Sequence, residues 1–365
     1  MFDRRLVYHF EWVLLLTVLL LAGIGIINLY SATASWTYGA TPLYLKQLVW
    51  LGSGLMVTLL VCLFDYRHLQ YLAVHSYLVG IGLLMAVALL GRSTMGATRW
   101  IHLGFINVQP SEVIKVAIIL LFARLLSKTA GPQGYDMKDL WRPALWLLLP
   151  TLLILKQPDL GTAVMVVLIA LTMLMFAGLR RPTIIWLSIL ALVTLVVGWF
   201  GLHDYQRARV RTFLNPEADP LGSGYHIIQS KIAVGSGGLF GKGFLEGTQA
   251  QLSFLPERHT DFVFSVFAEE WGFVGCLLLL LLYLFLIAWG LYIARRASDQ
   301  FGLFLAVGVT AMFFWHIVVN LAMVIGLLPV VGVPLPFFSY GGTSMVTMMI
   351  GVGLLMNVSM RRFMF

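Results

Sequence analysis

The chain has 365 residues, of which 60% are hydrophobic and 11% are charged, and its formal net charge is +8. Soluble domains average about 25% charged residues, so this composition excludes an ordinary soluble protein and predicts a polytopic membrane protein. The positive charge favours basic cytoplasmic loops over nucleic-acid binding. Cys62 and Cys276 both lie inside apolar runs, which argues against a disulfide framework.

Apolar runs long enough to cross a bilayer follow one another along the chain. A hydrocarbon core needs about 20 residues of helix. We therefore predict one all-α transmembrane domain over residues 1–365, with about ten membrane helices. The runs are Trp12–Leu29, Leu45–Phe64, Tyr71–Leu90, Val113–Leu126, Ala144–Leu155, Leu160–Gly178, Thr183–Leu202, Phe262–Ala294, Leu303–Leu328 and Gly341–Val358.

Lysine and arginine set the expected orientation. In the short loops they are concentrated on the side that holds both termini, so the positive-inside rule predicts that both termini are cytoplasmic. The long loop 203–261, between the seventh and eighth spans, is then extracytoplasmic. Within it, GYHIIQSKIAVGSGG (Gly224–Gly238) mixes isoleucines with polar residues and predicts a short amphipathic helix on the membrane surface.

Several ionisable residues lie within or at the ends of the predicted spans, where an unpaired charge is costly. Glu112 and Lys115 are three residues apart at the start of the fourth span, so they share a helix face and can pair. A structural ion pair and a role in substrate binding stay equally open. Asp159 begins the sixth span, where it can cap the helix. Glu269 and Glu270 either line a polar interior or belong to a long, tilted span.

The stretch LPERHTDF, Leu255–Phe262, places several polar residues directly before the eighth span. Asp261 lies at the helix start, where the helix dipole favours a negative charge, and it can accept a proton as a general base. Arg258 and His259, with the cations of the loop, can hold a phosphate or pyrophosphate. The alternative is a solvated basic loop near anionic lipid head groups. The loop cations are Arg207, Arg209, Arg211, Lys231 and Lys242.

Other motifs do not support a cofactor site. The stretch GSGGLFGKG lacks the first glycine of a P-loop and the hydroxyl residue after Lys242. The histidines form no H-x-x-x-H pair, which argues against zinc. No tightly bound cofactor is expected. A Mg²⁺ or Mn²⁺ ion held by one or two carboxylates and substrate phosphates stays an open alternative.

Four stretches carry a resemblance to a known family: Gly96–Lys115, Lys156–Ala163, His203–Gly272 and Gly326–Ser344. The resemblance covers essentially the full chain. On these stretches the chain resembles the SEDS family, named for shape, elongation, division and sporulation. The sequence LPERHTDF is similar to the RodA-type elongation branch, whereas the division branch typically has LPEAHTDF.

The resemblance implies a peptidoglycan glycosyltransferase of the bacterial inner membrane. Such an enzyme polymerises lipid II into β-1,4-linked glycan during cell elongation, with its active site facing the periplasm. The resemblance further implies that Asp261 is the essential carboxylate and that Glu112, Lys115 and Asp159 line the same cavity. Arg99, in the first stretch, joins the candidate substrate-binding residues. The implied partners are a class B penicillin-binding protein and other proteins of the rod-shape elongation complex.

An inverting displacement fits both the residues and the resemblance. Asp261 would deprotonate the acceptor hydroxyl, while cations stabilise the pyrophosphate leaving group. A lipid-linked precursor flippase or transporter is an alternative, because intramembrane charges and broken helices also occur in transporters. A transporter needs its charged site at the membrane midplane, whereas a polymerase needs it at the outer face. A weaker alternative is a scaffold that only recruits a synthase.

Overall fold

The computed structural model describes residues 10–34, 41–90, 100–103, 106–129, 134–201, 204–219, 224–252, 254–255 and 257–362. Each predicted apolar run overlaps one helix, and the all-helical membrane architecture is confirmed. The ten longest helices in these ranges are α2 (Trp12–Thr33), α3 (Leu43–Leu63), α4 (Tyr66–Leu90), α5 (Pro110–Thr129), α6 (Trp141–Lys156), α7 (Leu160–Ala177), α8 (Arg181–Gly201), α12 (Val263–Arg295), α13 (Gln300–Val324) and α14 (Gly342–Met360).

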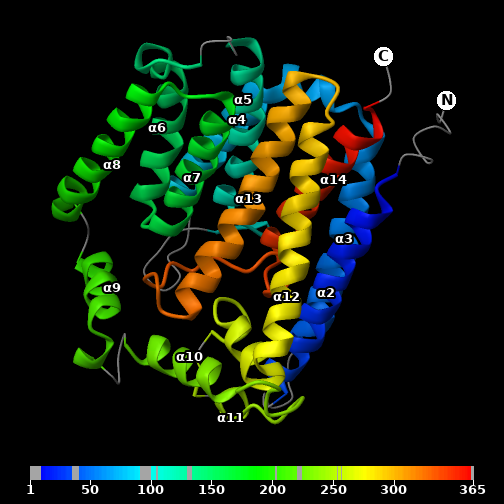
Figure 1. Ribbon diagram of the computed structural model, residues 1–365, viewed down its shortest axis with the longest axis vertical. Helices are drawn as coiled ribbons and strands as arrows, with labels where there is room; N and C mark the ends of the chain where they lie inside the picture. Colours follow the sequence, from blue (N-terminus) through cyan, green and yellow to red (C-terminus); the bar gives the residue numbers. More distant parts are fainter. Residues whose placement is uncertain are drawn as a thin grey trace.

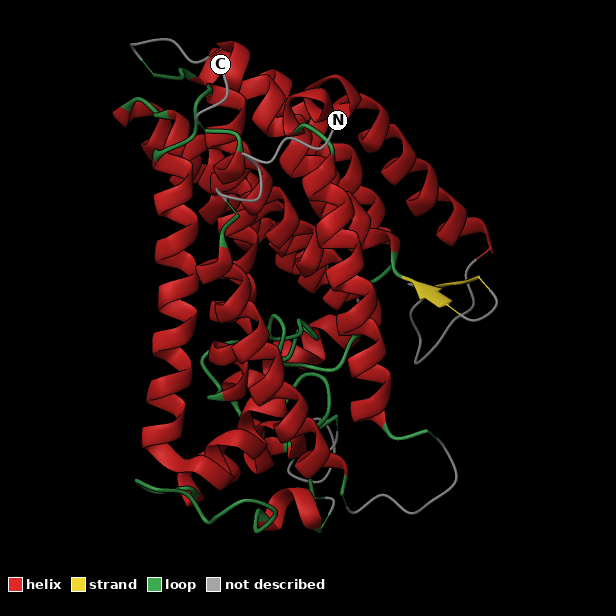
Figure 2. Ribbon diagram, turned by 90° about the vertical axis from the view of Figure 1, so that its right-hand side faces the viewer, coloured by secondary structure: helices red, strands yellow, loops and turns green. Residues whose placement is uncertain are grey.

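Eight of these helices are long and apolar enough to cross a membrane. The other two are α6, which has only 16 residues, and α5, whose 20 residues include four charged side chains. The count of ten spans therefore stays a prediction. A small antiparallel hairpin of β1 (Ile101–Leu103) and β2 (Ile106–Val108) precedes α5 and lies at the side of the bundle (Figure 2).

The long loop carries three short α-helices, α9 (Asp204–Leu214), α10 (Tyr225–Ser236) and α11 (Thr248–Gln251). The stretch with the amphipathic pattern forms α10, which buries Ile227 and Ala233 and exposes Lys231. The start of α2 and the end of α14 lie at one end of the molecule, and α9 to α11 lie at the opposite end (Figure 1). The side of the membrane that each end faces stays a prediction.

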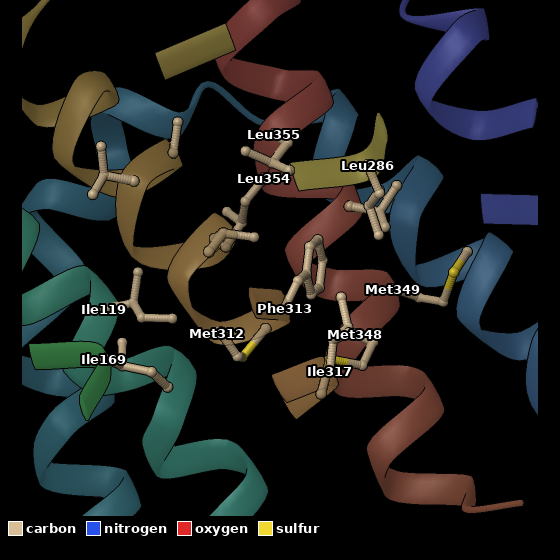
Figure 3. Close-up of a cluster of buried hydrophobic side chains, with 14 of the residues drawn as sticks. Ile119, Ile169, Leu286, Met312, Phe313, Ile317, Met348, Met349, Leu354 and Leu355 are labelled. Atoms are coloured by element: carbon tan, nitrogen blue, oxygen red, sulfur yellow. The ribbon is translucent and has the colours of Figure 1, made fainter. Parts of the chain in front are cut away.

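The core surrounds α13, which packs against α5, α7, α12 and α14. Large apolar side chains from all five helices meet there (Figure 3). In contrast, α8 buries only Thr183 and lies at the edge of the bundle. The labelled core residues include Ile119, Ile169, Leu286, Met312, Phe313, Ile317, Met348 and Leu355.

The segment 325–341, which joins α13 to α14, is non-helical and enters the bundle. Its side chains Leu335, Phe337 and Phe338 are buried. The Tyr283 hydroxyl donates to the Pro336 carbonyl at 2.8 Å. Inside a membrane, non-helical backbone is tolerated only where protein surrounds it and satisfies its polar groups. Figure 2 shows loops running between the helices in the half of the molecule away from the chain ends.

A break in α12 explains the glycine-rich stretch that precedes it. Gly272 has φ 63° and ψ −162°, a conformation essentially restricted to glycine. A Cβ there would lie 2.2 Å from the nitrogen of Gly241. The loop replaces the missing helical hydrogen bonds, so GSGGLFGKG supports a helix break. Its bonds, at 2.9 to 3.1 Å, run from Lys242 N to Glu269 O, Gly243 N to Glu270 O, Phe273 N to Gly238 O and Val274 N to Leu239 O.

Candidate functional site

The predicted pairing of Glu112 with Lys115 is present at the start of α5. The Lys115 Nζ lies 2.8 Å from Glu112 Oε1, and the two side chains are 1% and 4% exposed. His316 of α13 completes the cluster, because its Nε2 is 2.8 Å from the same Nζ. His316 Nδ1 is 3.1 Å from the Met312 carbonyl, which can only accept. The Nδ1 therefore carries the proton, and Nε2 accepts from Lys115.

This cluster keeps unused hydrogen-bonding capacity. Glu112 Oε2 is buried and has no hydrogen-bond partner within the described ranges. A buried acceptor without a partner is costly, and native proteins keep few of them. A bound donor, such as a sugar hydroxyl or a water molecule, would satisfy it. The cluster is thus suited to binding a ligand as well as to holding α5 against α13.

Asp159 caps α7, as predicted. Its carboxylate accepts from the backbone nitrogen of Thr162 at 3.2 Å and from the Thr162 hydroxyl at 2.9 Å. A Cβ on Gly161 would lie 2.6 Å from the Val331 carbonyl oxygen, so the start of α7 packs directly on the segment 325–341. This contact brings Asp159 next to the segment that also borders Asp261.

Asp261 lies half-buried in the turn before α12. Its Oδ2 is 3.6 Å from the position a Cβ on Gly332 would occupy, so the carboxylate faces the segment 325–341. Asn320 of α13 donates from Nδ2 to the Asp261 carbonyl at 3.0 Å and to the Val333 carbonyl at 2.8 Å. The start of α7, the segment and the turn of Asp261 therefore form one continuous packed unit.

Arg258 and His259 precede Asp261 in this turn. Arg258 is 3% exposed, and burial lowers the pKa of its guanidinium. Burial also lowers the pKa of His259, against the opposing charge of Glu257 and with the help of Arg258. The turn thus holds a buried cation, Arg258, close in sequence to the candidate base. It also holds the His259 imidazole, whose lowered pKa favours the neutral form.

Two loop cations lie against the segment 325–341. Arg209 Nη1 donates to the Val330 carbonyl at 3.1 Å. Arg209 also lines a small cavity of about 20 Å³ with Pro158 at the start of α7. The exposed Lys231 packs against Gly326, where a Cβ would lie 2.1 Å from the lysine Cε. Their predicted role in substrate binding stays a prediction.

Arg207 has a different environment from the other predicted cations. It donates to the last carbonyls of α8, those of Trp199 and Phe200, at 3.2 and 2.7 Å. It also pairs with Asp204 at 3.9 Å. These contacts cap α8, and substrate binding by Arg207 stays a prediction. Arg99 lies outside the described residues.

The paired glutamates of α12 hold the loop and a neighbouring helix. Glu269 is fully buried, and its Oε1 accepts from Lys242 Nζ at 2.6 Å and from the Thr248 hydroxyl at 2.9 Å. Glu270 accepts from the Ser31 hydroxyl of α2. These contacts give both carboxylates a structural function. No group of three or more His, Cys, Asp or Glu side chains in the described chain could hold a metal ion.

His316 and Asn320 are the site residues that the sequence analysis missed. They are four residues apart, so they lie on one face of α13, and they are 1% and 0% exposed. Two polar side chains with helical spacing inside the otherwise apolar stretch FFWHIVVNLAMV are a recognisable signal. That signal would have connected the Glu112–Lys115 pair with Asp261 through α13.

Comparisons with known proteins match almost the whole chain. The family model for FtsW, RodA and SpoVE, described as cell cycle protein, matches residues 11–363. The peptidoglycan glycosyltransferase MrdB of Escherichia coli strain K12 is 44% identical over 336 residues, which are 91% of this chain and 90% of MrdB. The peptidoglycan glycosyltransferase RodA of Treponema pallidum is 36% identical, over 98% of this chain and 99% of RodA.

Solved structures agree with these relatives. A chain from a peptidoglycan synthase complex that coordinates polymerization and crosslinking is 36% identical and matches with a TM-score of 0.82, over 98% of this chain and 99% of that chain. RodA of Thermus thermophilus is 32% identical and matches with a TM-score of 0.73, over 98% of each chain. Sequence and backbone thus agree over nearly the full length, and the chain belongs to the FtsW, RodA and SpoVE family and is a peptidoglycan glycosyltransferase.

Proposed function

We propose that this chain polymerises lipid II by an inverting displacement in which Asp261 is the general base. The Asp261 carboxylate takes the proton of the acceptor 4-hydroxyl. That oxygen then attacks the anomeric carbon of the donor, and the bond to the lipid pyrophosphate breaks. One displacement converts the α-linkage of the donor into a β-1,4 bond, so no covalent enzyme intermediate is needed.

The position of Asp261 is the observation that carries this proposal. Its carboxylate faces the segment 325–341 at the start of α12, next to the packed start of α7. The cluster of Glu112, Lys115 and His316 lies on the same face of α13 as Asn320, which holds the turn of Asp261. The carboxylate is half-buried, so it combines access with a fixed backbone. A general base needs both features.

The leaving pyrophosphate needs cationic partners. Arg258 is near Asp261 in sequence, and Arg209 and Lys231 lie along the segment 325–341. Arginine donates paired hydrogen bonds that match phosphate oxygens, which makes these side chains suitable partners for the leaving group. A Mg²⁺ or Mn²⁺ ion would need the substrate phosphates as ligands besides one or two carboxylates. The proposed step uses only the residues of the chain.

The proposed setting is the bacterial inner membrane, with both termini in the cytoplasm and Asp261 facing the periplasm. The positive-inside pattern and the placement of α9 to α11 at the end opposite the chain termini support this orientation (Figure 1). We propose a class B penicillin-binding protein, within the rod-shape elongation complex, as the partner. The match to a chain of a peptidoglycan synthase complex supports this assignment.

A polymerisation assay tests the proposal. The full chain is purified with its penicillin-binding partner, given labelled lipid II, and assayed for glycan polymer on a gel. Asp261→Asn should lower kcat by about 10²- to 10⁴-fold, because the base is lost while the shape of the side chain is kept. Glu257→Gln is the matched control, since Glu257 is an exposed carboxylate of the same turn and should tolerate the change.

Each other outcome has a definite meaning. Polymer made equally well by Asp261→Asn would eliminate the proposed base. Absence of polymer with the wild type, together with lipid II crossing liposome bilayers, would favour the transporter. An equal loss in both variants would indicate a general effect of charge in the turn, against a specific base.

A further inference from the structure

We infer that Asn320 is a positioning residue for glycosyl transfer, which fixes the Asp261 carboxylate by holding the backbone of its turn against the segment 325–341. This inference rests on the proposed role of Asp261. Asn320 itself lies behind the turn and is fully buried, so it acts through Asp261 and does not touch substrate.

The geometry of the amide defines this role. Its Nδ2 donates to the carbonyls of Asp261 and Val333, which come from separate parts of the chain, at 3.0 and 2.8 Å. Carbonyl oxygens can only accept, so the amide orientation follows from its two partners. Because one nitrogen joins both carbonyls, this side chain ties the turn to the segment at Val333, while a backbone bond from Tyr340 N to the His259 carbonyl, at 2.9 Å, joins them at a second point.

Replacing Asn320 would cost free energy, because two backbone carbonyls would lose their hydrogen-bond donor. The bond to the Val333 carbonyl is buried and the bond to the Asp261 carbonyl is partly buried, and an unpaired buried acceptor costs about 1–3 kcal/mol. Without the amide, the turn would move to find another donor or water, and the carboxylate would move with it. A displacement of about 1 Å in a reacting group can lower a rate by about 100-fold.

The chain contains a matched control for this test. Asn357 of α14 is also fully buried, and its Nδ2 also donates to two carbonyls, those of Val61 and Phe64, at 2.6 Å each. These carbonyls lie at the end of α3, remote in sequence from every residue of the proposed site. Asn357 therefore reproduces the two hydrogen bonds that Asn320 donates without contacting the turn of Asp261, and its Oδ1 in addition accepts from Tyr66 N and from Arg361.

The experiment compares Asn320→Leu with Asn357→Leu in the lipid II polymerisation assay, using the full chain with its partner and rates normalised to folded protein. Leucine keeps the approximate volume and removes both donors. We expect Asn320→Leu to lower kcat by about 10- to 100-fold with KM for lipid II unchanged. Asn357→Leu should lower the melting temperature and leave kcat per folded molecule unchanged. Asp261→Asn is measured in parallel.

A kcat of Asn320→Leu equal to that of the wild type, with Asp261→Asn inactive, would overturn the inference and leave the proposed base intact. Equal losses for the two leucine variants would also overturn it, because the role would then be structural only. An active Asp261→Asn would remove the proposed function and this inference together. If Asn320→Leu does not fold, Asn320→Ser decides: it keeps one donor on a shorter stem, so kcat should fall, and a wild-type kcat overturns the inference.

Discussion

Lys115 and Arg361 are both buried cations, but they are paired in different ways. Lys115 joins Glu112 and His316 in a cluster where Glu112 Oε2 has no hydrogen-bond partner among the residues the structure describes. Arg361, just after α14, donates to Asn357 Oδ1 and to the carbonyls of Cys62 and Leu63, and it lies 3.8 Å from Asp65. The first arrangement keeps an acceptor for a ligand, while the second joins helix ends.

This difference predicts a ligand-binding role for the Lys115 cluster and a structural role for Arg361. The planar guanidinium of Arg361 distributes its donors over backbone carbonyls that the end of α3 would otherwise leave unpaired. Lys115 instead contacts the side chains of Glu112 and His316, so it organises groups that can bind or react. The two regions should therefore respond differently when one charged partner is removed.

The largest expected effect comes from Lys115→Met. This change leaves the Glu112 charge buried without its cation, and removing one partner of a buried pair costs about 3–5 kcal/mol. The melting temperature in detergent should therefore fall strongly. Adding Glu112→Gln removes the remaining charge and should restore most of the stability.

Activity of this double variant decides between the two roles left open for the pair. A stable double variant that makes no polymer from lipid II would assign the pair to substrate binding. A stable double variant with the wild-type rate would show that Glu112 and Lys115 form only a structural ion pair. Lys115 and Arg361 would then have the same kind of role.

A smaller effect is expected from Arg361→Lys. Lysine keeps the charge but cannot reach the same carbonyls with a planar set of donors, and each lost bond to a charged donor is worth about 1.5–3 kcal/mol. The unfolding midpoint should fall, whereas kcat per folded molecule should match the wild type. A specific loss of kcat at unchanged stability would show that this end of the molecule also affects catalysis.

Features governed by local sequence were predictable. Apolar length located the membrane helices, the position before α7 identified the Asp159 cap, and helical spacing identified the pair of Glu112 with Lys115. Each of these depends on residues within about one helical turn or one bilayer thickness. The candidate base was located through its place at the start of α12, and its role stays a prediction.

Features that depend on distant partners were not predictable. The break at Gly272 requires the loop around Gly241 to supply hydrogen bonds, and nothing near Gly272 in sequence indicates this. Arg207 was grouped with the loop cations by charge alone, although its contacts are to the end of α8. The link from α13 to Asp261 needs Asn320 to meet a turn that lies 59 residues away.

The smallest expected effect is a pH dependence that originates at the Asp261 end. Burial lowers the pKa values of His226 and His259, so the folded protein holds both imidazoles neutral at a pH where the unfolded chain, with a histidine pKa of about 6.5, binds protons. As the pH falls below about 6.5, protonation then favours unfolding, and stability decreases until the lower folded pKa values are reached. A scan of melting temperature between about pH 8 and 5 should show this decrease, and His259→Gln should reduce its slope. A slope that His259→Gln leaves unchanged would show that the acid-sensitive groups lie away from the Asp261 end, against the expectation stated here.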